Sequence, residues 1–379
     1  MHRLKIALIA HIRHPIAEPF MGGMEAHSFQ LAKSLSAAGH EVTLFATGDS
    51  KAAGRLFPLL EQHYDRRYPW HEFHGTEVLN ALLDEAFGKL LPELAGFDVV
   101  HNNSLHRYPP RLSRRDRIPM VTSLHIPPFD ALRRAVHASA APWCRFTVCS
   151  QQQRAIWWPG GAPPEAHVLY NGIDLERFAF RPRGNGRGIW AGRITPTKGT
   201  HIAVAAARRA GIGLSIYGTI EHRDYFETEV KPLLGGDIRY EGHLETGELA
   251  EAMAAASVLL FTPLWQEPFG LVAAEAMACG VPVASLDNGA SREIVGPGGA
   301  LATEDTAEAL AAAIEVALTR ERRDVRRWAV SRYGQSAMID SCLRLYGQAM
   351  QGVDAPAAPV AFEPSMLPQR PEPQTVTAA

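Results

Sequence analysis

Short runs of apolar residues recur along the chain and alternate with segments of helical periodicity. The runs are rich in Val, Ile, Leu and Phe and lack a strict polar–apolar alternation, which is typical of strands buried on both faces of a parallel sheet. A first series of predicted strands comprises residues 4–10, 40–47, 98–103, 120–125, 145–150 and 165–171. A second series comprises residues 187–193, 214–218, 238–244, 258–263, 281–287 and 299–303.

Apolar side chains follow the helical repeat in the segments between these runs. In residues 22–39, Leu31, Leu35 and Ala38 recur at intervals of four and three, and Gly39 supplies a C-terminal stop. Further helices are predicted at residues 246–257, 308–319 and 335–351. Because strand and helix alternate twice over, the sequence predicts an α/β fold of two facing, Rossmann-like domains, each with a doubly wound parallel sheet.

The break between the two series falls at Phe180–Arg187. This segment contains Pro and Gly and few apolar residues, as a linker or hinge does. We therefore expect an N-terminal domain at residues 1–180, a second domain at 181–330 and a last helix at 331–351. Residues 352–379 are rich in Pro and Ala, a composition that predicts a disordered tail.

Composition limits the class of protein. The length of 379 residues suits two domains, and the formal net charge of −2 excludes a strongly basic nucleic-acid-binding protein. No apolar run approaches the roughly 20 residues of a membrane span, and the apolar stretch Leu4–Ala10 reads as a first strand and not as a signal peptide. The four cysteines form no CxxC pair, so a cytoplasmic location is expected.

The strongest chemical signal lies in Phe261–Val283. A helix is predicted there from about Phe269 to Ala278. Glu275 follows Glu267 by eight residues, about 12 Å along a helix axis, in an apolar setting. Either acid alone is as well explained by a helix cap or by pairing with an arginine. A buried carboxylate is costly unless it is paired or faces a ligand, so the two together favour a binding site.

Two loops predict a site for an anion. Arg193 and Lys198 lie between a predicted strand and the helix that follows, where two cations beside a helix N-terminus suit a phosphate. Gly22 and Gly23 lie between the first strand and the first helix, where glycines let the backbone approach a ligand. The plain alternatives are two solvated surface cations and an ordinary turn.

Familiar nucleotide and metal motifs are missing. No GxGxxG follows a predicted strand, and no GxxxxGK[ST] is present because Lys198 lacks the preceding glycine. A dinucleotide site of the Rossmann type and a P-loop are therefore disfavoured. The sequence has no DxD motif either, so we expect no metal and no other cofactor.

These motifs together resemble the retaining nucleotide-sugar glycosyltransferases of family 4, which have the GT-B fold. The EPFG start of the segment that contains Glu267 and Glu275, with its AEAMACGVPV continuation, is the most specific part of the resemblance. The matching pieces span roughly residues 4–345 in the family's order: Gly22–Gly23, Asn171–Asp174, Gly192–Arg193, Lys198–Gly199, Glu267–Gly270, Glu275 and Asp287–Glu293.

The resemblance implies a role for each site residue. Arg193 and Lys198 would bind the donor diphosphate and stabilise the leaving group, and Glu275 would bind the ribose. Glu267 would contact the donor sugar, and His125 would line the sugar site. The residues so assigned to catalysis are Arg193, Lys198, Glu267 and His125, and those assigned to donor binding are Gly22, Gly23, Phe269, Gly270, Leu271 and Glu275.

By the same resemblance, the N-terminal domain would bind the acceptor, the second domain would bind the donor, and the last helix would cross back onto the first domain. Ser150 and Arg154 match a family element that we interpret as mainly structural. We therefore expect a cytoplasmic, metal-independent, retaining glycosyltransferase that moves a hexose from a UDP- or GDP-sugar to an unidentified hydroxyl acceptor. The alternatives are a GT-B enzyme like the non-hydrolysing sugar-nucleotide epimerases and a nucleotide-sugar-binding protein without turnover.

Some features keep two interpretations. The basic stretch at residues 107–117 could attract an acidic acceptor or an anionic membrane surface, although a solvated loop is the favoured interpretation. Trp157 and Trp158 could form an apolar acceptor wall or belong to the core. His11 and His14 follow the first strand, where an acceptor would approach, and they rank below His125 as site residues.

Overall fold

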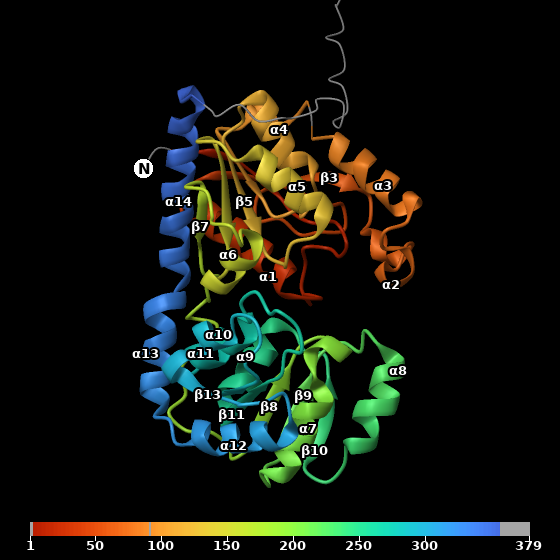
Figure 1. The fold of residues 1–379 in the computed structure, drawn as a ribbon, viewed down its shortest axis with the longest axis vertical. Coiled ribbons are helices and arrows are strands. Elements are labelled where there is room, and N and C mark those ends of the chain that lie inside the picture. The colour runs from red at the N-terminus through yellow and green to blue at the C-terminus, as the bar shows by residue number, and fades with distance from the viewer. Residues whose placement is uncertain (1–2, 91, 357–379) are drawn as a thin grey trace, which may run out of the picture.

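The computed structural model describes residues 3–90 and 92–356. Two parallel sheets form two domains, which lie one above the other in Figure 1. The seven-stranded sheet has the order β3-β2-β1-β4-β5-β6-β7, and the six-stranded sheet has the order β10-β9-β8-β11-β12-β13. Both orders reverse direction beside the first strand of the domain, as doubly wound sheets do, so the predicted fold class is confirmed.

The strands of the first sheet are β1 Lys5–Ile9, β2 Glu41–Thr47, β3 Arg55–Leu60, β4 Val99–Asn102, β5 Met120–Leu124, β6 Cys144–Val148 and β7 Ala166–Val168. Those of the second are β8 Gly188–Ala191, β9 Leu214–Tyr217, β10 Ile238–Gly242, β11 Val258–Phe261, β12 Val283–Ser285 and β13 Gly299–Leu301. Every predicted strand range overlaps an observed strand. One strand, β3, has no counterpart in the prediction.

Helices cover both faces of the sheets. In the N-terminal domain they are α1 Gly23–Ala37, α2 Trp70–Phe73, α3 Glu77–Gly88, α4 Tyr108–Asp116, α5 Asp130–Ser139 and α6 Gln151–Trp157. The later helices are α7 Thr200–Arg209, α8 Arg223–Tyr225, α9 Thr246–Ala255, α10 Leu271–Ala278, α11 Ser291–Val295, α12 Ala307–Leu318, α13 Arg322–Tyr333 and α14 Gln335–Gln351. No helix within residues 3–90 and 92–356 is long and apolar enough to cross a membrane.

The last two helices connect the domains. Helix α13 packs against α10 in the second domain, and α14 packs against α1 and strands β4, β5 and β6 of the first. Figure 1 shows them in blue as one continuous edge along both domains. Tyr346 of α14 is fully buried, and its hydroxyl lies 2.6 Å from Nδ1 of His101 on β4. The polar contact fixes the position of α14 against the sheet, which apolar packing alone would leave free to slide.

The start of the predicted disordered tail lies in an ordered turn. Residues Gly352–Asp354 form a 3₁₀ helix directly after α14. The Arg117 guanidinium donates to the carbonyls of Val353 and Ala355, at 2.8 and 2.7 Å. The rest of the predicted tail, residues 357–379, lies outside the described residues.

The basic stretch at residues 107–117 is not a loop, so that interpretation is wrong. It forms helix α4, and its arginines contact other residues of the protein. Arg111 is buried, Arg107 pairs with Asp84, and the Arg117 guanidinium lies 4.1 Å from the centre of the Trp143 ring. Trp157 and Trp158 belong to the core and do not form an acceptor wall. They are 0% and 6% exposed and pack in the same apolar cluster.

Candidate active site

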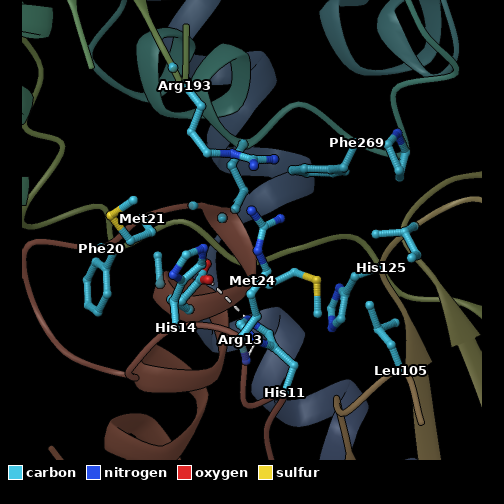
Figure 2. A pocket seen from close by; sticks show the side chains of 18 of the residues that line it. His11, Arg13, His14, Phe20, Met21, Met24, Leu105, His125, Arg193 and Phe269 are labelled. Atoms are coloured by element: carbon cyan, nitrogen blue, oxygen red, sulfur yellow. Dashed lines mark hydrogen bonds and ion pairs between the residues drawn. The ribbon is translucent and has the colours of Figure 1, made fainter. Parts of the chain in front are cut away.

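A cavity of about 960 Å³ lies between the two domains. Parallel strands of both sheets end at it, as expected for a ligand site in an open α/β sheet. All ten residues that the sequence assigned to the site line this one cavity: Gly22, Gly23, His125, Arg193, Lys198, Glu267, Phe269, Gly270, Leu271 and Glu275. Figure 2 shows Arg193 and Phe269 on one side and Met24, His125 and Leu105 on the other.

Arg193, just after β8, joins an ion-pair chain that crosses the cavity. Its Nη1 lies 2.6 Å from Oε2 of Glu221, and the other oxygen of Glu221 accepts from Nη2 of Arg13, in the first domain, at 2.9 Å. Arg13 also donates to Asp65 at 3.0 Å. Burial by itself would raise the pKa of Glu221, but the two guanidinium groups lower it below the usual value. Glu221 therefore stays ionised and links the domains.

Lys198 and Glu267 form a second, more buried pair. The Lys198 ammonium lies 2.6 Å from Oε2 of Glu267, and the Trp265 indole N–H donates to the same oxygen at 2.8 Å. The ammonium also lies 5.1 Å from the centre of the Trp265 ring, which favours a cation. One oxygen of Glu267 is thus held twice, and Glu267 lines the cavity.

The glycine after Lys198 allows this pair to form. Gly199 has a left-handed φ of +62°, and a Cβ there would lie 2.5 Å from the carbonyl oxygen of Thr262. Only glycine fits such a turn without displacing the neighbouring backbone. The interpretation of Arg193 and Lys198 as two solvated surface cations is therefore wrong, since both are half-buried ion-pair partners in the cavity wall.

Helix α10 begins two residues later than predicted, at Leu271. Gly270 takes a left-handed φ of +86°, and a Cβ there would lie 2.6 Å from the Phe261 ring. Glu267 therefore lies in the loop before the helix, so the prediction that both acids share one helix axis is wrong. The turn still brings Glu267 and Glu275 into the same cavity.

Glu275 is the acid that lacks a partner. It lies on α10 and lines the cavity, and among the described residues none makes a hydrogen bond or ion pair with its carboxyl group. Burial raises the pKa of Glu275 to about 7, with an opposing effect of Arg177. A partly buried carboxyl group without a partner among the described residues fits a ligand that supplies hydroxyl donors.

Gly22 and Gly23 bring the start of α1 against the second domain. Gly22 is the N-cap of α1 and has no side chain to bond the first turn, but the buried carboxyl group of Glu25 accepts from its own backbone N–H there. A Cβ at Gly22 would lie 3.2 Å from Oε2 of Glu25 and 3.8 Å from Nε of Arg193, and one at Gly23 would lie 2.7 Å from the Leu271 side chain. The start of α1 and Arg193 thus converge on one region, where the helix dipole and the guanidinium favour an anion and the Glu25 carboxylate opposes it.

His125, at the end of β5, has a neighbouring side chain at each ring nitrogen. Its Nε2 lies 3.2 Å from Oδ1 of Asn103, whose amide N–H₂ donates to Ser28. Its Nδ1 lies 3.4 Å from the Cys149 sulfur. Burial lowers the pKa of His125 well below its usual value, so the ring is neutral. Nε2 therefore carries the proton, while Nδ1 faces the Cys149 sulfur, whose thiol donates to Oδ1 of Asn171 at 3.7 Å.

Four residues at the site were not predicted from the sequence: Glu221, Arg13, Trp265 and Leu105. Glu221 and Arg13 carry no local signal, because their partners lie far away in the chain, whereas Trp265 donates to Glu267 only two residues on. Leu105 has a left-handed φ of +60°, which only one other non-glycine residue, Arg117, shares within the described part of the chain. That conformation costs a leucine roughly 1–2 kcal/mol. No feature of the sequence predicts it.

Two further contacts at the site join the domains. The Ser150 hydroxyl, at the start of α6, donates to the Pro268 carbonyl at 2.8 Å, in agreement with a structural role. Glu293, in the acidic position of the predicted later segment, accepts from the backbone N–H of Gln151 at 3.0 Å. No group of three or more His, Cys, Asp or Glu residues that could hold a metal ion occurs in the part of the chain that the structure describes.

Known proteins resemble the chain along both domains. Residues 21–177 match the family model Glycosyltransferase Family 4, and residues 182–334 match Glycosyl transferases group 1. Glycogen synthase of Mycobacterium tuberculosis is 28% identical over 403 residues, covering 92% of this chain and 97% of that protein. D-inositol 3-phosphate glycosyltransferase 1 of Catenulispora acidiphila is 26% identical, covering 92% of this chain and 96% of that one.

A solved structure shares the arrangement of the two domains. The crystal structure of Anabaena HepE in complex with UDP-glucose has a TM-score of 0.70 to this chain at 20% identity, covering 90% of this chain and 100% of that one. Together with the two parallel sheets, this similarity confirms the predicted GT-B fold.

Proposed function

The chain belongs to the family 4 glycosyltransferases and is a transferase enzyme, and from this premise we propose that it moves a hexose from a UDP- or GDP-sugar to a hydroxyl acceptor with retention of configuration. The observation that carries the proposal is the convergence of Arg193, Lys198 and the start of α1 on one cavity that also holds Glu275, whose carboxyl group has no partner among the described residues. Two cations and a helix N-terminus suit a diphosphate, and a partly buried carboxyl group without a partner suits ribose hydroxyls.

The ion pairs in the structure suggest how the donor would bind. The diphosphate would replace the carboxylate of Glu221 as the partner of Arg193 and would draw Lys198 from Glu267. Glu267 would then use its oxygens to accept hydrogen bonds from the sugar hydroxyls. The cations would neutralise the negative charge that grows on the leaving diphosphate, which is the task that a metal ion performs in other transferases. We therefore propose that the reaction needs no metal.

Retention would follow from attack on the face that the diphosphate leaves. The acceptor oxygen forms the new bond to the anomeric carbon, the bond from that carbon to the phosphate oxygen breaks, and the acceptor proton passes to the departing phosphate. The pKa of His125 supports this choice of base, because burial lowers it well below the usual value and makes the ring a weak proton acceptor. The complex of HepE with UDP-glucose supports a uridine nucleotide as the first candidate donor.

The cytoplasm is the compartment that we propose. All four cysteines are free and buried. Such thiols suit a reducing environment, where disulfides do not form.

The first experiment is a calorimetric titration with UDP and with GDP in the presence of EDTA. Wild-type protein should bind one of the two nucleotides, and Lys198→Ala should weaken that binding at least tenfold because a cation in contact with phosphate is lost. The control is Lys231→Ala, which removes an exposed lysine of the same domain whose partner is Glu227 on the surface. This control should bind as the wild type does.

Turnover separates the proposal from its alternatives. With the sugar form of the nucleotide that binds, wild-type protein should hydrolyse the donor slowly without acceptor and transfer the sugar with one. Binding without either reaction would favour a nucleotide-sugar-binding protein. Formation of an epimerised sugar nucleotide would favour the epimerase-like enzyme.

A further inference from the structure

We propose that the acceptor is an uncharged hydroxyl compound with a flat apolar ring body, bound against the N-terminal wall of the cavity. This inference rests on the proposed glycosyl transfer and names the class of its second substrate. The wall is formed by the loop after β1, the start of α1, helices α2 and α3, and the loops after β4 and β5.

Charges on this wall are already paired. Arg13 contacts Asp65 and Glu221, Arg107 pairs with Asp84, and Glu25 lies 3.2 Å from Nε2 of His11. An acceptor phosphate or carboxylate would have to take an arginine from its carboxylate. Because Arg13 already holds two carboxylates, whereas Arg193 and Lys198 hold one each, this exchange is less favourable here than at the donor site.

Three histidines of the wall, His14, His106 and His125, add no positive charge at neutral pH. Burial lowers the pKa values of His14 and His106 below their usual value, as it does for His125. His106 is stacked on Phe87 with ring centres 4.4 Å apart, and its Nε2 lies 3.1 Å from Asp84. These rings thus present neutral faces to the cavity.

Some polar groups of the wall already have partners, which favours an acceptor with few hydroxyl groups over a glycan. The Ser104 hydroxyl donates to Asn102 at 2.6 Å, and Nε2 of His125 lies 3.2 Å from Oδ1 of Asn103. Each hydroxyl group of a sugar acceptor that meets such an engaged atom would be buried without a partner, at a cost in binding free energy.

Apolar side chains fill the space between these pairs. Phe20, Met21, Met24 and Leu105 line the wall, and all four appear around the cavity in Figure 2. Trp70 and Phe129 line it as well and are 42% and 44% exposed, which is unusual for large aromatic side chains. Aromatic faces and flexible methionines suit a flat apolar body, which would cover this exposed surface.

Leu105 provides an independent observation. Its left-handed backbone, with φ of +60°, is strained for leucine, whereas glycine, asparagine or aspartate would adopt it readily. Strained backbone of this kind occurs preferentially at functional sites. Here the strain presents an isobutyl group to the cavity near His125, where the acceptor hydroxyl must approach the sugar.

The test measures binding of three probes: 1-naphthol, myo-inositol 1-phosphate and maltotriose. Each is titrated calorimetrically into wild-type protein, alone and with saturating nucleotide. We expect 1-naphthol to bind at least tenfold more tightly than either of the other probes. Equal or tighter binding of the phosphate or of maltotriose, or no measurable binding of 1-naphthol, overturns the inference.

The Leu105→Asn variant tests the location. Asparagine relieves the backbone strain and replaces the apolar group by an amide, so the melting temperature should stay or rise while the affinity for 1-naphthol falls at least fivefold. Val78→Asn is the matched control, because Val78 is an exposed aliphatic residue of α3 outside the cavity wall. Unchanged naphthol affinity in Leu105→Asn, or an equal loss in Val78→Asn, overturns the inference.

The titrations with nucleotide distinguish a failure of the proposed donor site from a failure of the proposed acceptor class. Failure of UDP and GDP to bind contradicts the proposed donor site, whereas the titrations of 1-naphthol without nucleotide report on the acceptor wall alone. In Leu105→Asn the nucleotide affinity should equal that of the wild type, since Leu105 lies on the wall opposite Arg193.

Discussion

The carboxyl group of Glu275 has no hydrogen-bond or ion-pair partner among the described residues, so its removal from water on folding carries a stability cost. Burial raises its pKa from 4.5 to about 7. A raised pKa means that folding favours the protonated form. The folded state is therefore most stable, with respect to this group, below the unfolded pKa, and that stability is lost as the pH rises through about 7.

Glu275→Gln should accordingly stabilise the free protein in a pH-dependent way. At pH 8 the free energy of unfolding should rise by about 1–3 kcal/mol, because the amide has no charge to desolvate. At pH 4.5 the gain should shrink towards zero. Denaturant titrations of both proteins at the two pH values measure this difference, and a gain of equal size at both would contradict the raised pKa. The same variant should bind nucleotide more weakly, because it loses the carboxylate that would accept hydrogen bonds from the ribose hydroxyls.

Most of the site's residue types could be predicted because they lie in local motifs. Glu267, Gly270 and Glu275 occur within nine residues of one another, and Arg193 and Lys198 within six. Glu221 and Leu105 could not be predicted from the sequence. The importance of Glu221 depends on arginines from both domains, and that of Leu105 depends on a backbone angle that its residue type disfavours.

At the scale of elements, strands were the most predictable feature and helix ends the least. Strands buried on both faces are continuous apolar runs, which stand out in the sequence. The edge strand β3 was missed because it contains Pro58 and is largely accessible, and proline is tolerated at an edge where a central strand would exclude it. The start of α10 was misplaced because Pro268 suggested a first turn, whereas the left-handed Gly270 delays it.

Gly270→Ala tests the importance of that turn. The new methyl group would meet the Phe261 ring at 2.6 Å, and alanine is strained at a φ of +86°. We expect a loss of at least about 1 kcal/mol in the free energy of unfolding, together with weaker nucleotide binding. Gly247→Ala, in the first turn of α9 with nothing within 4 Å of the new methyl group, serves as the control. It should be neutral or stabilising, because alanine favours a helix over glycine.

At the scale of the whole molecule, Glu221 links the domains across the cavity in the absence of a ligand. Replacing it by glutamine removes the charge that attracts Arg13 and Arg193. Glu221→Gln should therefore increase the radius of gyration of the nucleotide-free protein in X-ray scattering. The matched variant Glu227→Gln, which affects only surface pairs with Lys231 and Arg223, should not. Identical scattering curves for all three proteins would show that the ion-pair chain does not hold the domains together.

The return of α14 to the first domain has a consequence for biosynthesis. Its residues Ile339, Leu343 and Tyr346 belong to the same apolar core as Leu8 of β1 and Leu44 of β2. A ribosome adds them only after the entire second sheet has been made. While the second domain is being translated, the first exposes the apolar face that α14 will later cover. The domain that is started first is thus finished last, and a nascent chain stopped before residue 335 should need a chaperone to keep that face from aggregating.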